Sequence, residues 1–415
     1  MLGIGLGLDA LRPGDDPAVQ GLKLDFANGV HARQGVMFAT PGAVTGLSFA
    51  RSGASTARKA DGQVVSFADG VARVTDRGLL IEEARSNLLL RSQELDAASW
   101  TKSNAVVTAD ASAAPDGAMT ADRVASAATA SVAVQQSAAA GAAFATASVF
   151  IKKGSGATEA NVFRLRNMTT ANTLLEVSID HDGGVVTYVT GSSGAVLSAA
   201  ADGWRRLALS AVSGVSSGDS LRFDVCFVGT AASAGAHATV WGAQLEAGRW
   251  ASAYTPSAAA TASRGADSLT VAYGLAAGAD VTECGVVEFT RDTGQAACIV
   301  DLHDGSDANR VHVERGAGGE FRAYVTVEGV SQLIGSLARP GARMVKWALS
   351  RTGDRYALAV DGQTAGVVTV AGLPSLTGRR LGAMRGGSAW LNDYLVEQGS
   401  IPWAMSDGLM LSRTA

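Results

Sequence analysis

Strict alternation of apolar and polar residues is the feature that most restricts how this 415-residue chain can fold. In NVFRLRN, Phe163 and Leu165 fall on one side of an extended chain, and Arg164 and Arg166 fall on the other. The same period of two recurs, between turns rich in Gly, Asp and Ser, in TASVFIKKG, LLEVSID, WRRLALSAV, LRFDVCFVG and VWGAQLEAG. This pattern predicts an antiparallel β-sandwich.

A second series of alternating segments follows Ser257. It includes CGVVEFTRD, AACIVDLHDG, RVHVERG, EFRAYVTVEG and RYALAVDGQTAG, with hairpin turns expected at Gly318-Gly319 and Asp361-Gly362. The intervening YTPSAAATASRGA has no periodicity, so we interpret it as a linker or as an edge shared by the two domains, with the boundary near Ser257. A second sandwich is therefore expected over residues 258–415.

The first 80 residues are irregular and carry only short apolar pairs broken by Gly and Asp-Gly. We expect them to form an anchor or stem that becomes ordered by docking on a partner. The apolar start has no basic leader region, and Asp9 interrupts it early, so neither a signal peptide nor a membrane span is expected. The predicted domains are residues 1–80, 81–257 and 258–415.

Several classes of function are disfavoured by composition and motifs. The net charge is −4, charged residues make up 17% and no basic stripe appears, so nucleic acid is not an expected partner. The five histidines lack zinc spacing, and no Gly-x-Ser-x-Gly motif occurs at a strand-to-helix turn, so the chain is not expected to be an enzyme. The three cysteines form no disulfide framework and are expected to be free thiols.

One loop, DLHDGSDANR, concentrates Asp301, Asp304 and Asp307. Oxygen ligands within one loop suit Ca²⁺. The alternative is a polar loop whose acids cap their own backbone, and we favour it because no complete calcium-loop spacing is present. No cofactor is expected.

The polar faces of the strands offer the best candidate binding groups. Forked donors and carboxylates are the groups that bind sugar hydroxyls, although an ordinary solvated sheet face would have a similar composition. Trp100, Trp250, Trp390 and Trp403 lie near expected strand or loop ends, where an indole could contact a ligand. The candidate ligand-binding residues are Arg164, Arg166, Glu176, Arg206, Asp224, Trp390 and Trp403.

Two parts of the chain resemble known families. RGLLIEEARSNLLLRSQELDAASWTKSNAVVTADASAAPDGAMTADRV and VWGAQLEAGRWASAYTPS resemble the phage head spike fibre domain of tailed-phage structural proteins and gene transfer agents, which is similar to jelly-roll carbohydrate-binding modules. VVEFTRD, VDLHDGSDANRVHVERGAGGEFRAYV and YALAVDGQTAG resemble concanavalin-like laminin-G sandwiches. Together the resemblances cover about residues 78–415. They imply an all-β protein of two antiparallel jelly-roll sandwiches after an irregular N-terminal anchor.

The resemblance also implies a role. It implies a fibre on the surface of a phage or phage-like particle, assembled in the bacterial cytoplasm, that attaches to host capsule or envelope polysaccharide. Capsid or other virion proteins would hold the N-terminal segment, the fibre would be a homo-oligomer, and no membrane insertion is implied. The alternatives are a purely structural capsid decoration or connector protein, and a polysaccharide depolymerase.

Overall fold

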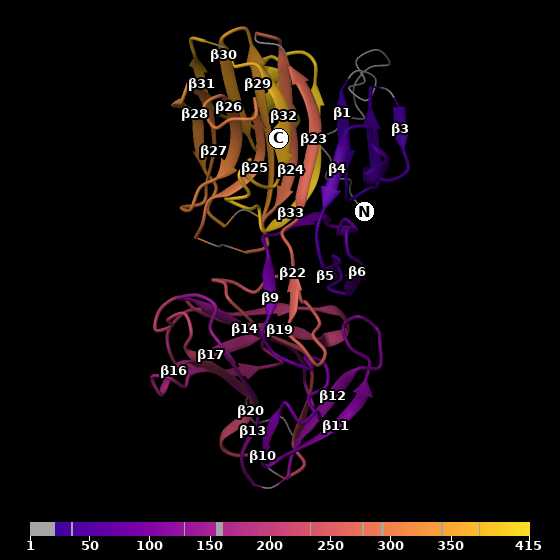
Figure 1. The fold of residues 1–415 in the computed structure, drawn as a ribbon, viewed down its shortest axis with the longest axis vertical. Coiled ribbons are helices and arrows are strands. Elements are labelled where there is room, and N and C mark those ends of the chain that lie inside the picture. The colour runs from indigo at the N-terminus through magenta and orange to yellow at the C-terminus, as the bar shows by residue number, and fades with distance from the viewer. Residues whose placement is uncertain are drawn as a thin grey trace. The chain divides into compact units, whose positions relative to one another are not determined.

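The computed structural model describes residues 21–34, 36–127, 129–154, 161–232, 234–275, 278–291, 294–341, 343–372 and 374–415. It confirms the predicted fold class, because the described residues are nearly all β apart from one C-terminal helix. They divide into two compact units, each built from separate stretches of the chain (Figure 1). Unit 1 comprises residues up to Ser52, Gly70–Glu83 and Ala266–Ala415, and unit 2 comprises Gly53–Asp69 and Ala84–Gly265. Within the described residues, no helix is long and apolar enough to span a membrane.

Unit 2 is an antiparallel sandwich of two six-stranded sheets, here called sheets E and F. Successive strands cross between the two sheets, as in a jelly roll. Sheet E has, in spatial order, β10 (Thr101–Ser103), β13 (Ala130–Ala139), β20 (Ser220–Ala232), β15 (Asn161–Asn167), β16 (Asn172–Asp180) and β17 (Val185–Thr190). Sheet F has β11 (Ala105–Ser112), β12 (Ala121–Ser126), β21 (His237–Glu246), β14 (Ala145–Lys152), β19 (Arg205–Ala211) and β18 (Ala195–Ala199). Two small sheets pair β5 (Ser55–Arg58) with β6 (Val64–Phe67), and β22 (Ala262–Arg264) with β9 (Arg85–Asn87).

The core of unit 2 follows the predicted alternation, with one exception. Phe163, Leu165 and Phe223 lie in the core between the sheets, as the period of two requires. Trp241 was expected on the same side as Ala243, but it lies on the opposite face of sheet F. The pairing of β14 with β21 shifts register at this point, and Gly242 has φ +65°, so a bulge reverses the side on which residues point.

The outer face of sheet F is covered by other parts of unit 2. Phe150, Trp241 and Tyr254 form an aromatic cluster there, and Val64 from the segment before β9 packs against it. The Thr56 hydroxyl donates to the Tyr254 carbonyl at 2.7 Å. Residues 53–69 therefore belong to the fold of unit 2.

Unit 1 is a second sandwich, with a ten-stranded and a seven-stranded sheet. The larger sheet contains β3 (Val36–Phe38), β2 (Val30–Arg33), β1 (Leu22–Asp25), β33 (Asp393–Ile401), β24 (Val281–Glu288), β29 (Met344–Thr352), β30 (Arg355–Val360) and β31 (Gln363–Thr369), with β7 (Val74–Thr75) and β8 (Gly78–Ile81) joined to β33. The smaller contains β28 (Val330–Ala338), β27 (Glu320–Val327), β26 (Arg310–Arg315), β25 (Ala297–His303), β32 (Leu376–Leu381), β23 (Ser268–Leu275) and β4 (Leu47–Ala50). Helix α2 (Asp407–Thr414) packs Met410 against an apolar patch that includes Ala348 of the larger sheet.

The early part of the chain is built into the sheets of unit 1. Leu22 pairs with Ser400, and Ala50 pairs with Ser268, so β1 and β4 extend sheets whose other strands lie far along the chain. Arg73 is fully buried and forms ion pairs with Glu82 and Asp267, which joins two of the three chain stretches of unit 1. The described residues of the expected anchor thus form strands of a sandwich, and residues 1–20 of that prediction lie outside the described part.

The expected linker is also a packed part of unit 2. The Tyr254 side chain is buried, with its hydroxyl 2.6 Å from the Ser92 hydroxyl. Ser257 donates from its hydroxyl to the Leu89 carbonyl at 2.6 Å. Small residues here form specific hydrogen bonds in place of periodic packing, and the passage between units falls near Gly265 and Ala266.

Candidate ligand-binding face

The outer face of sheet E carries a cluster of charged side chains on its middle strands. Arg164 and Arg166 project from β15, Arg222 and Asp224 from β20, and Glu176 from β16. Because residues two apart in a strand point the same way, each pair stands on the face opposite the core. These five residues are here called the arginine face.

Asp224 forms the floor of the arginine face. Its side chain is fully buried, and Arg222 binds it in a two-pronged contact, with Nε–Oδ1 at 2.6 Å and Nη2–Oδ2 at 3.1 Å. Arg164 lies opposite Asp224 on the neighbouring strand and places its Nε 3.2 Å from Oδ2. One carboxylate thus orients two guanidinium groups, which keep 18% and 27% of their side chains exposed.

Glu176 and Arg166 complete the arginine face. Glu176 lies opposite Arg164 on β16, with Oε2 3.8 Å from Nη1. Arg166 lies opposite Arg222, and its side chain makes no hydrogen bond or ion pair with any residue in the described ranges. Three guanidinium groups therefore share two carboxylates, and the excess charge is positive.

The edge of sheet E beside the arginine face is less polar. Ser178 on β16 lies opposite Thr187 on β17, and Val185 and Val189 flank Thr187 with more than half of their surface exposed. Gln135 lies opposite Asp224 on the other side. The face therefore combines fixed charges, hydroxyl and amide groups, and exposed methyl groups, which are groups that a saccharide can contact through its hydroxyls and its C–H surfaces.

The structure brings together four of the seven predicted site residues: Arg164, Arg166, Glu176 and Asp224. It corrects the placement of Arg206, which is buried in sheet F and not in sheet E. Arg206 donates to the Ser252 carbonyl at 2.7 Å and to the Ser148 hydroxyl at 3.0 Å, and it lies over the Phe150 ring. Arg206 therefore stabilises the covered outer face of sheet F.

Arg222 was missed as a site residue. Its signal was present in the sequence, because Arg222 and Asp224 share the polar side of LRFDVCFVG. The sequence alone does not predict the pairing of β20 with β15. This pairing places Arg222 opposite Arg166 and Asp224 opposite Arg164.

Trp390 and Trp403 belong to unit 1, where they pack against different apolar clusters. Trp390 is half-buried, with Arg380 over its ring at 4.9 Å, and its Nε1 donates to the Gly387 carbonyl at 3.1 Å. Trp403 packs beside helix α2, and its carbonyl accepts a bond from Thr282. Trp100, also expected to be accessible, is 1% exposed in the core of unit 2.

The acidic loop of unit 1 binds its own groups. Asp304 accepts bonds from the Ser306 hydroxyl, the Asn309 amide and the Ser306 backbone, which lower its pKa to about 2. Asp307 pairs with Arg385, and Asp301 is buried and accepts a bond from the Arg385 backbone at 2.8 Å. Burial raises the pKa of Asp301. In the described part of the chain, no three His, Cys, Asp or Glu side chains converge as metal ligands would.

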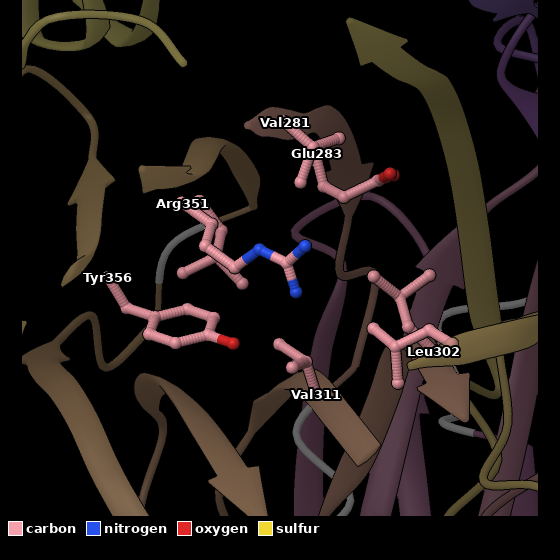
Figure 2. Close-up of a pocket in the computed structure, with 8 residues that line it drawn as sticks. Val281, Glu283, Leu302, Val311, Arg351 and Tyr356 are labelled. Atoms are coloured by element: carbon pink, nitrogen blue, oxygen red, sulfur yellow. The ribbon is translucent and has the colours of Figure 1, made fainter. Parts of the chain in front are cut away.

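A small pocket lies inside the sandwich of unit 1 (Figure 2). The Arg351 guanidinium and the Tyr356 hydroxyl turn toward one another in it, and Glu283 lies at its wall. Arg351 donates twice to the Ala279 carbonyl, at 2.9 and 2.7 Å. All eight lining residues are at most 5% exposed, so the pocket is interior space of the core and offers no open surface to a polymer. Its lining is Val281, Glu283, Leu302, Val311, Leu349, Arg351, Tyr356 and Leu376.

Together these features define an all-β protein of two antiparallel sandwiches, with a charged sheet face as its candidate site. No protein-family model matches the chain, and no curated protein matches it. Solved structures do resemble it. The carbohydrate-binding module CBM40 of the Ruminococcus gnavus IT-sialidase, bound to α2,6-sialyllactose, is 12% identical and covers 34% of this chain and 85% of its own, with a TM-score of 0.29.

Two further structures match at a similar level. The heptameric SAP-like pentraxin of Limulus polyphemus is 14% identical and covers 36% of this chain and 75% of its own, with a TM-score of 0.28. The leech intramolecular trans-sialidase is 15% identical and covers 33% of this chain and 23% of its own, with a TM-score of 0.28. Each match covers about a third of the chain, and TM-scores this low bear on neither its family nor its ligand.

Proposed function

We propose that this protein is a virion surface fibre, a head spike or tail fibre of a phage or gene transfer agent, that attaches the particle to polysaccharide of the host cell. The sequence resemblance of residues 77–124 and 240–257 to head spike fibre domains supports the virion role. Unit 2 holds residues 84–124 of the first stretch and all of the second, and it also carries the arginine face. The glycan would bind on that face.

The observation that carries the proposal is the preorganised arginine face. Asp224 fixes Arg164 and Arg222 before any ligand arrives, so less side-chain entropy is lost when a ligand binds. Sheet F has its outer face covered by residues 53–69 and by the Tyr254 turn, whereas the arginine side chains of sheet E remain partly exposed. A rigid, partly exposed polar face suits a binding role better than a role in packing subunits.

The host polysaccharide as partner and the phage or phage-like particle as setting are the same as those that the sequence resemblance implies. Assembly takes place in the bacterial cytoplasm, virion proteins hold the chain, and several copies form the fibre. The structural alternative, a decoration or connector protein, shares every one of these features except glycan binding. The depolymerase alternative needs a pair of catalytic carboxylates, and on the arginine face both carboxylates have arginine partners.

Adsorption to host cells tests the proposal. Particles carrying Arg166→Ala with Arg222→Ala should adsorb at least tenfold more weakly than wild-type particles, since each lost charged hydrogen bond costs roughly 1.5–3 kcal/mol. The control is Arg91→Ala with Arg249→Ala, which removes the same charge elsewhere in unit 2. Equal adsorption by both variants, with both chains folded and incorporated, would favour the structural alternative.

A further inference from the structure

Arg166 differs from the other arginines of the arginine face in lacking a partner. Arg222 donates two hydrogen bonds to Asp224, and Arg164 forms ion pairs with Asp224 and Glu176. The Arg166 side chain has neither a hydrogen bond nor an ion pair within the described residues, and its Nε is buried without a partner. A guanidinium group cannot lose its proton in this setting, so the charge is permanent.

The residues paired with Arg166 do not neutralise its positive charge. Arg166 lies directly opposite Arg222, so two arginine side chains project from paired positions on neighbouring strands. On its other side Arg166 lies opposite Thr173, which is uncharged. Like charges at paired positions repel, and a bound anion would turn this repulsion into attraction.

The protein as a whole does not share this positive charge. Its net charge is −4, so general attraction of polyanions to the chain is not expected. The positive excess is local, and it is held on a rigid sheet where five donors of one guanidinium group form a fixed fork. Such a fork matches the two oxygens of a carboxylate, or two oxygens of a sulfate, better than it matches single hydroxyl groups.

Neither Phe150 nor Tyr188 contributes a ring to the arginine face. Phe150 is buried in the aromatic cluster on sheet F, and Tyr188 packs against the core and accepts at its hydroxyl from the Ala195 backbone. The described part of the face therefore presents charged and hydrogen-bonding side chains to a ligand, with the methyl groups of Val185 and Val189 at its edge.

We propose that the arginine face selects saccharides that carry an oxyanion, and that Arg166 is the residue that binds this group. The inference rests on the proposed function, and it narrows the ligand to acidic glycans such as those built from uronic or other sugar acids. Binding forms ion-paired hydrogen bonds and involves no covalent step. Asp224 acts as the positioning residue that aims Arg222 toward the same group.

The test uses one polymer backbone in three charge states: dextran, carboxymethyl-dextran and dextran sulfate. Wild-type protein should bind at least one charged form about tenfold or more tightly than dextran, and the preference should shrink as salt is raised. Arg166→Gln should abolish the preference, and Arg166→Lys should keep part of it, because lysine retains the charge but not the fork. Arg249→Gln, which removes an exposed arginine elsewhere in unit 2, should leave it unchanged.

The three polymers and the Arg166 variants distinguish the possible outcomes. Carboxymethyl-dextran and dextran sulfate distinguish a carboxylate from a sulfate as the source of the oxyanion. Equal binding of dextran and both charged forms, or a preference that survives in Arg166→Gln, overturns the inference, as does the absence of any binding. If host adsorption still falls in the arginine-face variant described above, the proposed function stands without the selectivity for acidic sugars.

Discussion

The backbones of Gly335 and Gly366 touch where the two sheets of unit 1 meet at one edge. A Cβ atom added to Gly335 would lie 2.6 Å from the Gly366 nitrogen, and one added to Gly366 would lie 2.4 Å from the Gly335 Cα. Gly335 belongs to β28 of the smaller sheet and Gly366 to β31 of the larger. The contact closes this side of the sandwich at a distance that only glycine permits.

Replacing either glycine should therefore push the sheets apart. Gly335→Ala should lower the free energy of unfolding by about 2 kcal/mol, because the obstructing atoms are backbone and cannot rotate away. Gly408→Ala, in helix α2 with no atom near the added Cβ, should be neutral or stabilising. Denaturant midpoints of the three proteins measure this, and equal midpoints for wild type and Gly335→Ala would contradict it.

The arginine face should respond unevenly to mutation. Asp224→Asn leaves Arg164 and Arg222 without their shared carboxylate, and should cost about 2 kcal/mol of stability. Arg166→Ala breaks no ion pair and should change stability by only about 0.5 kcal/mol. Chemical denaturation of unit 2 compares them. Similar losses for the two variants would show that Asp224 is not the organising group.

Acid should weaken unit 1 through His312. This side chain is buried against Tyr324, and burial, together with the charges of Arg310 and Arg322, lowers its pKa from 6.5 to about 3. The unfolded chain then binds more protons than the folded one between these values, so stability is lost as pH falls from about 6.5 toward 3. Over the whole of this pH range the loss in the free energy of unfolding amounts to about 5 kcal/mol.

His312→Phe keeps a ring beside Tyr324 and removes the titration. Urea midpoints measured at pH 7 and pH 4 should fall less in this variant than in wild type. Parallel decreases in the two proteins would contradict the assignment to His312. The nearby carboxylate Glu314, whose Oε2 lies 4.0 Å from His312, is unchanged in both.

The thiols of unit 1 should be unreactive until it unfolds. Cys284 and Cys298 are free and buried, and burial raises the pKa of both, so neither forms thiolate readily. A thiol reagent should label these two only after denaturation, when three thiols per chain are expected from the sequence. Rapid labelling of Cys284 or Cys298 in the native protein, located by peptide mapping, would contradict this.

Truncation at residue 52 should unfold unit 1. The sequence suggested a detachable anchor, but removing β1 takes away a strand that pairs with β33, and it removes the buried Leu24 and Phe26 from the core. We expect the shortened chain to melt in two steps, with unit 1 losing stability strongly and unit 2 little changed. Unchanged melting of unit 1 in calorimetry would show that these strands are dispensable.

The sequence predicted most of the strands of unit 2 and the side on which their residues lie. Alternation in β15, β16 and β20 placed Phe163, Val177 and Phe223 in the core correctly. It could not foresee the bulge at Gly242, because the residue count alone does not reveal where a register shifts. It also could not separate Arg206 from Arg164, since both stand at polar positions and only strand order assigns them to different sheets.

The N-terminal strands were missed for a related physical reason. Short segments such as LKLD bury their apolar residues only when β33 lies beside them, and nothing in the sequence of the segment itself indicates that distant partner. Pairing between remote segments depends on the packing of the whole core. The local sequence pattern alone therefore predicts irregular structure for such segments.

The discontinuity of unit 1 sets an order of events during synthesis. All residues of unit 2 have been translated once Gly265 has been added, so this unit can fold while the rest of the chain is still being made. Strand β1 leaves the ribosome early and can pair with β2, but its other edge has no partner until β33 emerges, and β4 has no partner until β23 emerges. The exposed edges of these early strands stay unpaired until their partner strands have been made. We therefore expect the chain to be most prone to aggregation while residues 266–415 are being translated.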